Sequence, residues 1–209
     1  MRLILVRHGE TSCNVLDVWH GWDDCELTEI GLAQARAVAA RLADEPIAAV
    51  YSSDSRRALQ TARAIAGQHA LEPVSHAGLR ERNAGGFEGL TIHEIVSRFP
   101  TVWQDRDADL WGWSPPGGEP CRAVLDRGMT VVDYLQGRYP TETVVAVSHM
   151  SMVRALISRL GDIPLADTYS VPFPSTGVSI ITIDGERSRL DMLNDASHTG
   201  AAPPDTRWL

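Results

Sequence analysis

Two histidines follow apolar runs in the same way, and their positions predict a site for chemistry on an anion. Residues 3–6 (LILV) are directly followed by Arg7 and His8, and residues 143–147 (TVVAV) by a serine and His149. Such short, branched runs are typical of strands buried in a parallel sheet, whose ligands bind beyond the carboxyl ends of the strands. If the two strands are parallel neighbours, both imidazoles face one cleft. A single histidine at a strand end is more often structural, but two matching ones favour function.

Two further charged residues would suit chemistry on a phosphate. Arg57 follows a predicted strand (47–51) and lies in the first turn of a predicted helix (55–68), where free N–H groups and the helix dipole also attract anions. A guanidinium can hold two phosphate oxygens at once. Glu81 lies in a predicted loop (79–89), and a carboxyl group there could donate the proton that a leaving oxygen needs. Taken alone, Arg57 could equally be a solvated surface charge, and a loop carboxylate such as Glu81 usually is one.

The elements that would position these residues alternate between strand and helix. Further helices are predicted after the N-cap Thr28, from the capping-box residue Thr91 to about Pro100, and over 119–137 and 150–160. A short edge strand is predicted near 73–77, and Asp184-Gly185 predicts a hairpin turn near the end of the chain. This alternation predicts an α/β fold, a three-layer α/β/α sandwich with a mainly parallel central sheet.

The chain is predicted to form one domain over 1–198, with a lid-like insertion at about 91–118 and a flexible tail over 199–209. Residues 101–118 combine prolines and glycines with tryptophans, which favours an irregular segment over a regular element. The tryptophans of this segment are Trp103, Trp111 and Trp113. They could wall a pocket for an aromatic or otherwise bulky alcohol, but packing of the insertion onto the domain is the favoured interpretation.

Composition narrows the partners. The 209 residues carry a formal net charge of -8, which argues against a nucleic-acid or membrane-surface binder but allows a small anionic substrate held by a local arginine cluster. No apolar run approaches the roughly 20 residues that span a bilayer, and no secretory signal is evident. The three cysteines, Cys13, Cys25 and Cys121, are odd in number and widely spaced, so neither a disulfide framework nor a thiolate zinc site is expected. We therefore expect a cytoplasmic protein; a homodimer is compatible with the sequence, but no residue specifies its surface.

Six motifs, in their order along the chain, resemble those of the histidine phosphatase superfamily, which contains the cofactor-dependent phosphoglycerate mutases. The resemblance covers residues 2–198. The matching residues are Arg7-His8-Gly9-Glu10-Thr11 with Asn14; Gly21, Asp24, Leu27-Thr28 and Gly31; Ser52-Ser53 with Arg57-Ala58 and Gln60-Thr61-Ala62; Glu81 with Phe87-Glu88-Gly89; Pro116-Gly117-Gly118-Glu119; and Val147-Ser148-His149.

The resemblance implies a phosphoglycerate mutase-like fold and a reaction through a phosphohistidine on His8, with no metal and no cofactor. The phosphoryl oxygens would be held by Arg7, Arg57 and His149. Glu81 would protonate the leaving oxygen and later deprotonate the attacking water. Secondary contacts to phosphate or substrate would come from Asn14, Thr11 and Gly21.

A phosphatase is favoured over a mutase. The mutases of this family usually carry an inserted basic segment, whereas residues 91–118 hold only two cations, Arg98 and Arg106, against four acidic residues. The predicted function is a metal-independent phosphomonoesterase acting on small phosphorylated metabolites. A 2,3-bisphosphoglycerate-dependent phosphoglycerate mutase is the alternative. A non-catalytic phosphate-binding protein is disfavoured, because a binder has no need of the acid Glu81.

Overall fold

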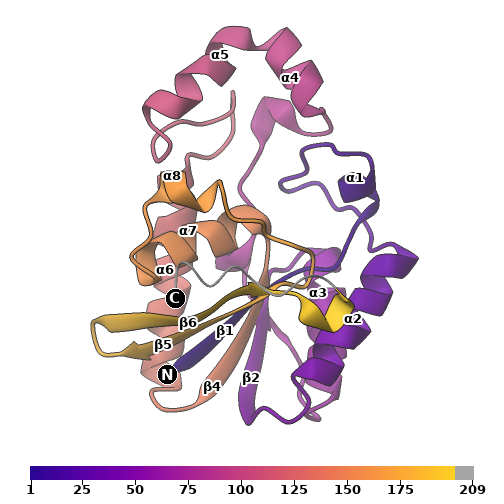
Figure 1. Ribbon diagram of the computed structural model, residues 1–209, viewed down its shortest axis with the longest axis vertical. Helices are drawn as coiled ribbons and strands as arrows, with labels where there is room; N and C mark the ends of the chain where they lie inside the picture. The colour runs from indigo at the N-terminus through magenta and orange to yellow at the C-terminus, as the bar shows by residue number, and fades with distance from the viewer. Residues whose placement is uncertain (201–209) are drawn as a thin grey trace.

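The computed structural model describes residues 1–200, whose strands form one six-stranded sheet of order β3-β2-β4-β1-β5-β6 (Figure 1). β1, β2, β3 and β4 pair in parallel, and β5 and β6 are antiparallel, so the predicted mainly parallel sheet is confirmed. The strands span Arg2–Arg7 (β1), Ile47–Ser52 (β2), Val74–Ser75 (β3), Thr143–Ser148 (β4), Val178–Asp184 (β5) and Arg187–Asp195 (β6).

The two strands that precede the histidines are neighbours, as predicted. β1 and β4 run parallel in register, and Arg7 lies opposite Ser148 at their carboxyl ends. The backbone N–H of His8 donates to the carbonyl of Ser148 at 2.9 Å, which extends the pairing by one step. His8 and His149 therefore leave the sheet side by side.

Helices cover both faces of the sheet, which confirms the three-layer architecture. The α-helices span Ser12–Val15 (α1), Glu29–Arg41 (α2), Arg56–Gly67 (α3), Ile92–Arg98 (α4), Pro100–Gln104 (α5), Cys121–Arg138 (α6), Met150–Leu160 (α7) and Leu165–Thr168 (α8). Alternate residues of β1 point to opposite faces. Leu3 and Leu5 join the core under α6 and α7, and Ile4 and Val6 join the core under α2 and α3. Burial on both faces explains why the strand is an unbroken apolar run.

Helices α4 and α5 lie at the top of Figure 1, above the end of the sheet where α1 lies. The expectation of an irregular segment is wrong at its start, because residues 100–104 form α5 and Asp105–Ala108 form a short 3-10 helix. Pro100 occupies the first turn of α5, where its missing N–H has no helical partner to lose. Trp103 and Trp113 pack with Phe87 in an aromatic cluster, as the packing interpretation predicted.

The cysteine prediction is wrong, because Cys13 and Cys25 form a disulfide. The chain doubles back between them, and Thr11 and Leu27 make an antiparallel bridge that brings the two cysteine Cα atoms to 6.0 Å. That separation suits a disulfide, which a rule based on cysteine count and short spacing does not detect. The bond removes the cysteine-based reason for expecting a reducing compartment. Cys121 is buried and free.

The end of the described chain is also more regular than expected. Residues Ser197–Thr199 form a 3-10 turn, and Thr176 Oγ1 lies 3.0 Å from His198 Nε2. The predicted flexible tail, 199–209, falls almost entirely outside the described residues. Over residues 1–200, none of the helices combines the length and apolar character needed to cross a bilayer.

Candidate active site

The structure brings both histidines together beyond the sheet. The imidazole centroids of His8 and His149 are 5.0 Å apart, and both side chains are buried. A third histidine, His20, lies with its ring centroid 6.2 Å from that of His8. His20 comes from the loop between α1 and α2 and was not predicted from the sequence; its only signal was its place beside the motif residue Gly21.

The orientation of His8 is fixed by its own backbone. Its Nδ1 lies 2.7 Å from the carbonyl oxygen of Gly9, which can only accept, so Nδ1 carries a proton and Nε2 keeps its lone pair. The N–H of Gly9 donates to Thr61 Oγ1 at 3.1 Å, which ties this turn to α3. A Cβ at Gly9 would stand 2.5 Å from the carbonyl oxygen of Gly31, so only glycine fits here.

Both strand-end histidines are held neutral. Burial, together with the Arg7 and Arg57 guanidinium groups, holds the pKa of His8 well below its usual range. Burial and Arg57 do the same to the pKa of His149. A neutral His8 with a free Nε2 is a potential nucleophile at neutral pH.

Arg57 is fully buried and joins His149 to the loop that contains Gly21 and Asp23. Its Nε donates to His149 Nδ1 at 3.2 Å, and its two terminal nitrogens donate to the carbonyls of Asp23 and Gly21 at 2.7 and 2.8 Å. Because His149 Nδ1 accepts, the proton of the neutral ring sits on Nε2, within 3.3 Å of Ser55 Oγ. Arg57 thus orients His149 as a hydrogen-bond donor.

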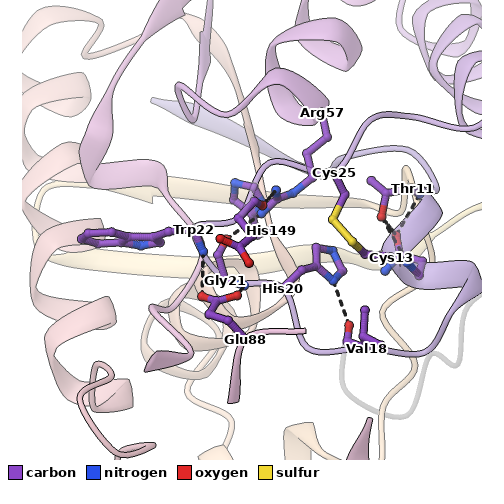
Figure 2. The surroundings of a disulfide bond; sticks show 12 residues. Thr11, Cys13, Val18, His20, Gly21, Trp22, Cys25, Arg57, Glu88 and His149 are labelled. Atoms are coloured by element: carbon purple, nitrogen blue, oxygen red, sulfur yellow. Dashed lines mark hydrogen bonds between the residues drawn. A yellow bond between two sulfur atoms is a disulfide. The ribbon is translucent and has the colours of Figure 1, made fainter. Parts of the chain in front are cut away.

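The loop that receives Arg57 is itself held by a motif carboxylate (Figure 2). Glu88 accepts the N–H groups of Gly21 at 2.8 Å and of Trp22 at 3.1 Å. A Cβ at Gly21 would stand 2.3 Å from the carbonyl oxygen of Arg82, so this position also requires glycine. Figure 2 shows the disulfide beside this loop, on the side of His20.

Glu81 lies at the N-terminus of α7. Its carboxylate accepts the N–H of Ser151, with both oxygens at 3.2 Å, and the N–H of Arg82 at 2.7 Å. The backbone of this loop is clamped by Arg127, which donates to the carbonyls of Gly78, Arg80 and Glu81 at 2.9, 2.6 and 2.9 Å. Arg127 is in turn paired through two contacts with Glu119 of the Gly-Gly-Glu motif. The acid is therefore placed by contacts from three segments.

A cavity of about 430 Å³ opens beside these groups. Of the residues predicted for the site, it is lined by Arg7, His8, Asn14, Gly21 and Glu81. Arg57 and His149 are not among its lining residues; His149 lies beside His8 and lines a second, smaller pocket that shares Gly21 and Glu81 with the first. Thr11 is buried and not on the lining; it forms a capping box for α1 with Asn14.

Aromatic rings and further charges also line the cavity. Trp19, Trp103 and Trp113 contribute rings, whereas Trp111 does not reach the cavity and packs against the main core. The charged lining residues that the sequence did not predict are Asp17, Arg82, Arg106 and Arg154. Arg82 donates to the carbonyls of Glu119 and Trp113 and so has a structural role.

Among residues 1–200, no group of three or more His, Cys, Asp or Glu side chains is arranged to hold a metal ion. The convergent groups are instead two neutral imidazoles, several guanidinium groups and one carboxylate. Together they offer a nucleophile, donors for an oxyanion and a general acid.

Comparisons with known proteins agree with this geometry. The family model of the histidine phosphatase superfamily (branch 1) matches residues 3–196. Phosphoserine phosphatase 1 of Hydrogenobacter thermophilus is 29% identical, with 96% of this chain and 95% of the relative aligned. Glucosyl-3-phosphoglycerate phosphatase of Mycolicibacterium vanbaalenii is 35% identical over 78% of this chain and 76% of the relative. The solved structure of Bacillus stearothermophilus YhfR superposes with a TM-score of 0.86 at 34% identity, covering 95% of this chain and 98% of that one. The chain belongs to the histidine phosphatase superfamily, branch 1.

Proposed function

We propose that this protein is a metal-independent phosphomonoesterase that transfers the phosphoryl group of its substrate to Nε2 of His8 and then to water. The observation that carries this proposal is the state of His8: neutral, with Nδ1–H committed to the Gly9 carbonyl and the Nε2 lone pair free. In the first step the Nε2–P bond forms as the bond from phosphorus to the alcohol oxygen breaks. In the second, water attacks phosphorus and His8 leaves.

Positive charge and donors suit the phosphoryl oxygens, over which charge is spread in the transition state. Arg7 lines the cavity, and its buried Nε–H has no partner within residues 1–200, so an anion in the cavity would supply the missing acceptor. His149, which Arg57 orients, would turn its Nε2–H from Ser55 Oγ to a phosphoryl oxygen. Arg57 adds positive charge beside His149.

Glu81 serves as acid and then as base. It lines the same cavity as His8, with its carboxylate held at the N-terminus of α7, and we assign to it the protonation of a leaving oxygen bound opposite Nε2. As the protonated carboxyl it gives its proton to that oxygen; as the carboxylate it takes a proton from the attacking water. Arg127 positions it without touching the substrate.

Hydrolysis is favoured over mutase chemistry because the segment above the cavity offers little free positive charge. Arg98 pairs with Glu94 on the surface of α4, and Arg106 pairs with Asp107. Two of the relatives compared above are named as phosphatases, which also supports hydrolysis.

The experiment is a turnover screen over phosphorylated metabolites and p-nitrophenyl phosphate, with and without a chelator. We expect phosphate release unaffected by the chelator, a trapped acid-labile phosphohistidine in the wild type, and loss of both in His8→Ala. Glu81→Gln should slow turnover of substrates with poor leaving groups most. Isomerisation of 3-phosphoglycerate stimulated by 2,3-bisphosphoglycerate, in excess over hydrolysis, would favour the mutase instead; phosphate binding without any turnover would favour a binding protein.

A further inference from the structure

Arg154 is a cation in the cavity whose side chain makes no hydrogen bond and no ion pair within residues 1–200. It projects from α7 and lines the cavity, and its buried Nε has no hydrogen-bond acceptor within the described part of the chain. No carboxylate of residues 1–200 forms an ion pair with it. Its guanidinium instead lies over the rings of Tyr169, at 4.4 Å, and Phe173, at 4.8 Å.

A partly buried guanidinium without a counter-ion is unfavourable, because it has lost hydration and gained no anion. The two aromatic rings compensate in part through cation–π attraction and fix the plane of the guanidinium. What they leave unsatisfied is hydrogen bonding in that plane, which a bound anion could supply. The other arginines that line the cavity each have such a contact: Arg7 and Arg82 donate to backbone carbonyls, and Arg106 pairs with a carboxylate.

A second guanidinium borders the same wall. Arg106 lines the cavity, and its guanidinium lies 4.4 Å from the ring centroid of Trp103. It also lies 5.9 Å from the ring centroid of Tyr169, the ring that Arg154 contacts. Tyr169 therefore contacts two cations, Arg154 and Arg106. Arg106 is already paired with Asp107, which leaves the single charge of Arg154 without an ion pair among residues 1–200. A single carboxylate matches that charge better than a phosphate dianion, and its two oxygens fit the planar fork of Arg154.

The position of Arg154 relates it to the leaving group. It lies three residues after Ser151, whose N–H holds the carboxylate of Glu81. Residues three apart share one face of a helix, about one turn or ~5 Å along its axis. Because Glu81 is placed to protonate the leaving oxygen, a group held by Arg154 belongs to the alcohol part of the substrate, a short distance from the phosphate.

We propose that Arg154, assisted by Arg106, forms a subsite for a carboxylate on the alcohol part of the substrate, so that the enzyme selects phosphomonoesters of hydroxy acids. This inference rests on the proposed phosphatase function and assigns its substrate class. The aromatic remainder of the cavity leaves room for a larger group attached to the acid.

The test compares 3-phosphoglycerate with glycerol 3-phosphate, which differ in having a carboxylate or a hydroxymethyl group. A charged hydrogen bond of this kind predicts a preference of the wild type for 3-phosphoglycerate of about tenfold to a hundredfold in kcat/KM. Arg154→Met should abolish most of that preference and Arg154→Lys should retain part of it, and in both variants kcat/KM should fall by a larger factor for 3-phosphoglycerate than for p-nitrophenyl phosphate. Arg98→Met is the matched control, since Arg98 is exposed on α4 and outside the cavity; it should leave the preference unchanged.

Calorimetry separates this inference from the proposed function. If neither compound is hydrolysed, the phosphatase proposal fails, but tighter binding of 3-phosphoglycerate than of glycerol 3-phosphate, lost in Arg154→Met, would still support the subsite. Equal kcat/KM and equal affinity of the wild type for the two compounds would overturn it, even if Arg154→Met failed to fold. An equal loss for both compounds and for p-nitrophenyl phosphate in Arg154→Met would also overturn it, because it would show a general structural role.

Discussion

Replacing Cys13 and Cys25 together with serine tests whether the disulfide stabilises the loop that underlies the site. The cysteines are 12 residues apart in sequence. A cross-link that closes a loop of this size lowers the entropy of the unfolded chain enough to contribute about 3 kcal/mol to the free energy of unfolding. The closed loop includes Gly21 and Asp23, whose carbonyls hold the Arg57 guanidinium. We therefore expect the double variant to lose about 3 kcal/mol of stability and also to lose part of its kcat/KM.

Urea unfolding with and without dithiothreitol provides the assay. Reductant should destabilise the wild type by about the same amount as the double substitution and should leave the double variant unaffected, which is the matched control. Titration of thiols in the denatured, untreated protein should find one, Cys121, and three after reduction. Three thiols without reductant, or a loss of stability below about 0.5 kcal/mol, the scale of a neutral surface substitution, would refute the reasoning.

Three further predictions concern groups that hold the site. Arg127→Met removes the contacts to the Glu81 loop and should lower kcat by about tenfold or more while leaving KM less affected, with Arg127→Lys intermediate; equal kcat values in a steady-state assay would contradict this. The lowered pKa of His8 places the acid limb of kcat/KM below pH 6.5. In the unfolded chain His8 binds a proton near pH 6.5, whereas the buried His8 does not. The free energy of unfolding should therefore fall as the pH drops below 6.5, by up to about 1.4 kcal/mol per pH unit for this residue. Urea unfolding of the wild type and of His8→Gln between about pH 7.5 and 5.5 checks the sign. Gly21→Ala should clash with backbone and abolish most activity, whereas Gly67→Ala, with open space around its Cβ position, should be neutral in both activity and thermal unfolding.

Most of the fold could be predicted from hydrophobic periodicity and from the residues at the ends of strands. The unbroken apolar run of β1 predicts a strand buried on both faces, and its alternate residues do divide between the two helix layers. Two such strands, each ending in a histidine, predicted the meeting of His8 and His149 because parallel neighbours end at one edge of the sheet. The position of a strand depends on the residues within it, so the sequence alone was enough to predict where each strand ends.

The contacts that the sequence did not reveal join residues of different segments, between which there is no periodic relation. The disulfide depends on a loop that doubles back, and Cys13 and Cys25 have no periodic signal. Arg154 lies on a helix that the sequence predicts over 150–160, yet its missing partner becomes evident only when Tyr169 and Phe173 are packed around it. Helix periodicity identifies which face is buried but not whether a charge on it is paired.

One helix links catalysis to selectivity in this site. The N-terminal turn of α7 follows His149, and its Ser151 N–H holds Glu81, while the next turn carries Arg154. Since a helix is rigid over two turns, helix geometry sets the spacing between the Ser151 N–H that holds Glu81 and the backbone of Arg154. A substrate acid would therefore be selected by the fixed spacing between its ester oxygen and its carboxylate. Hydroxy acids with a longer separation should bind through one group at a time and lose the preference that Arg154 confers.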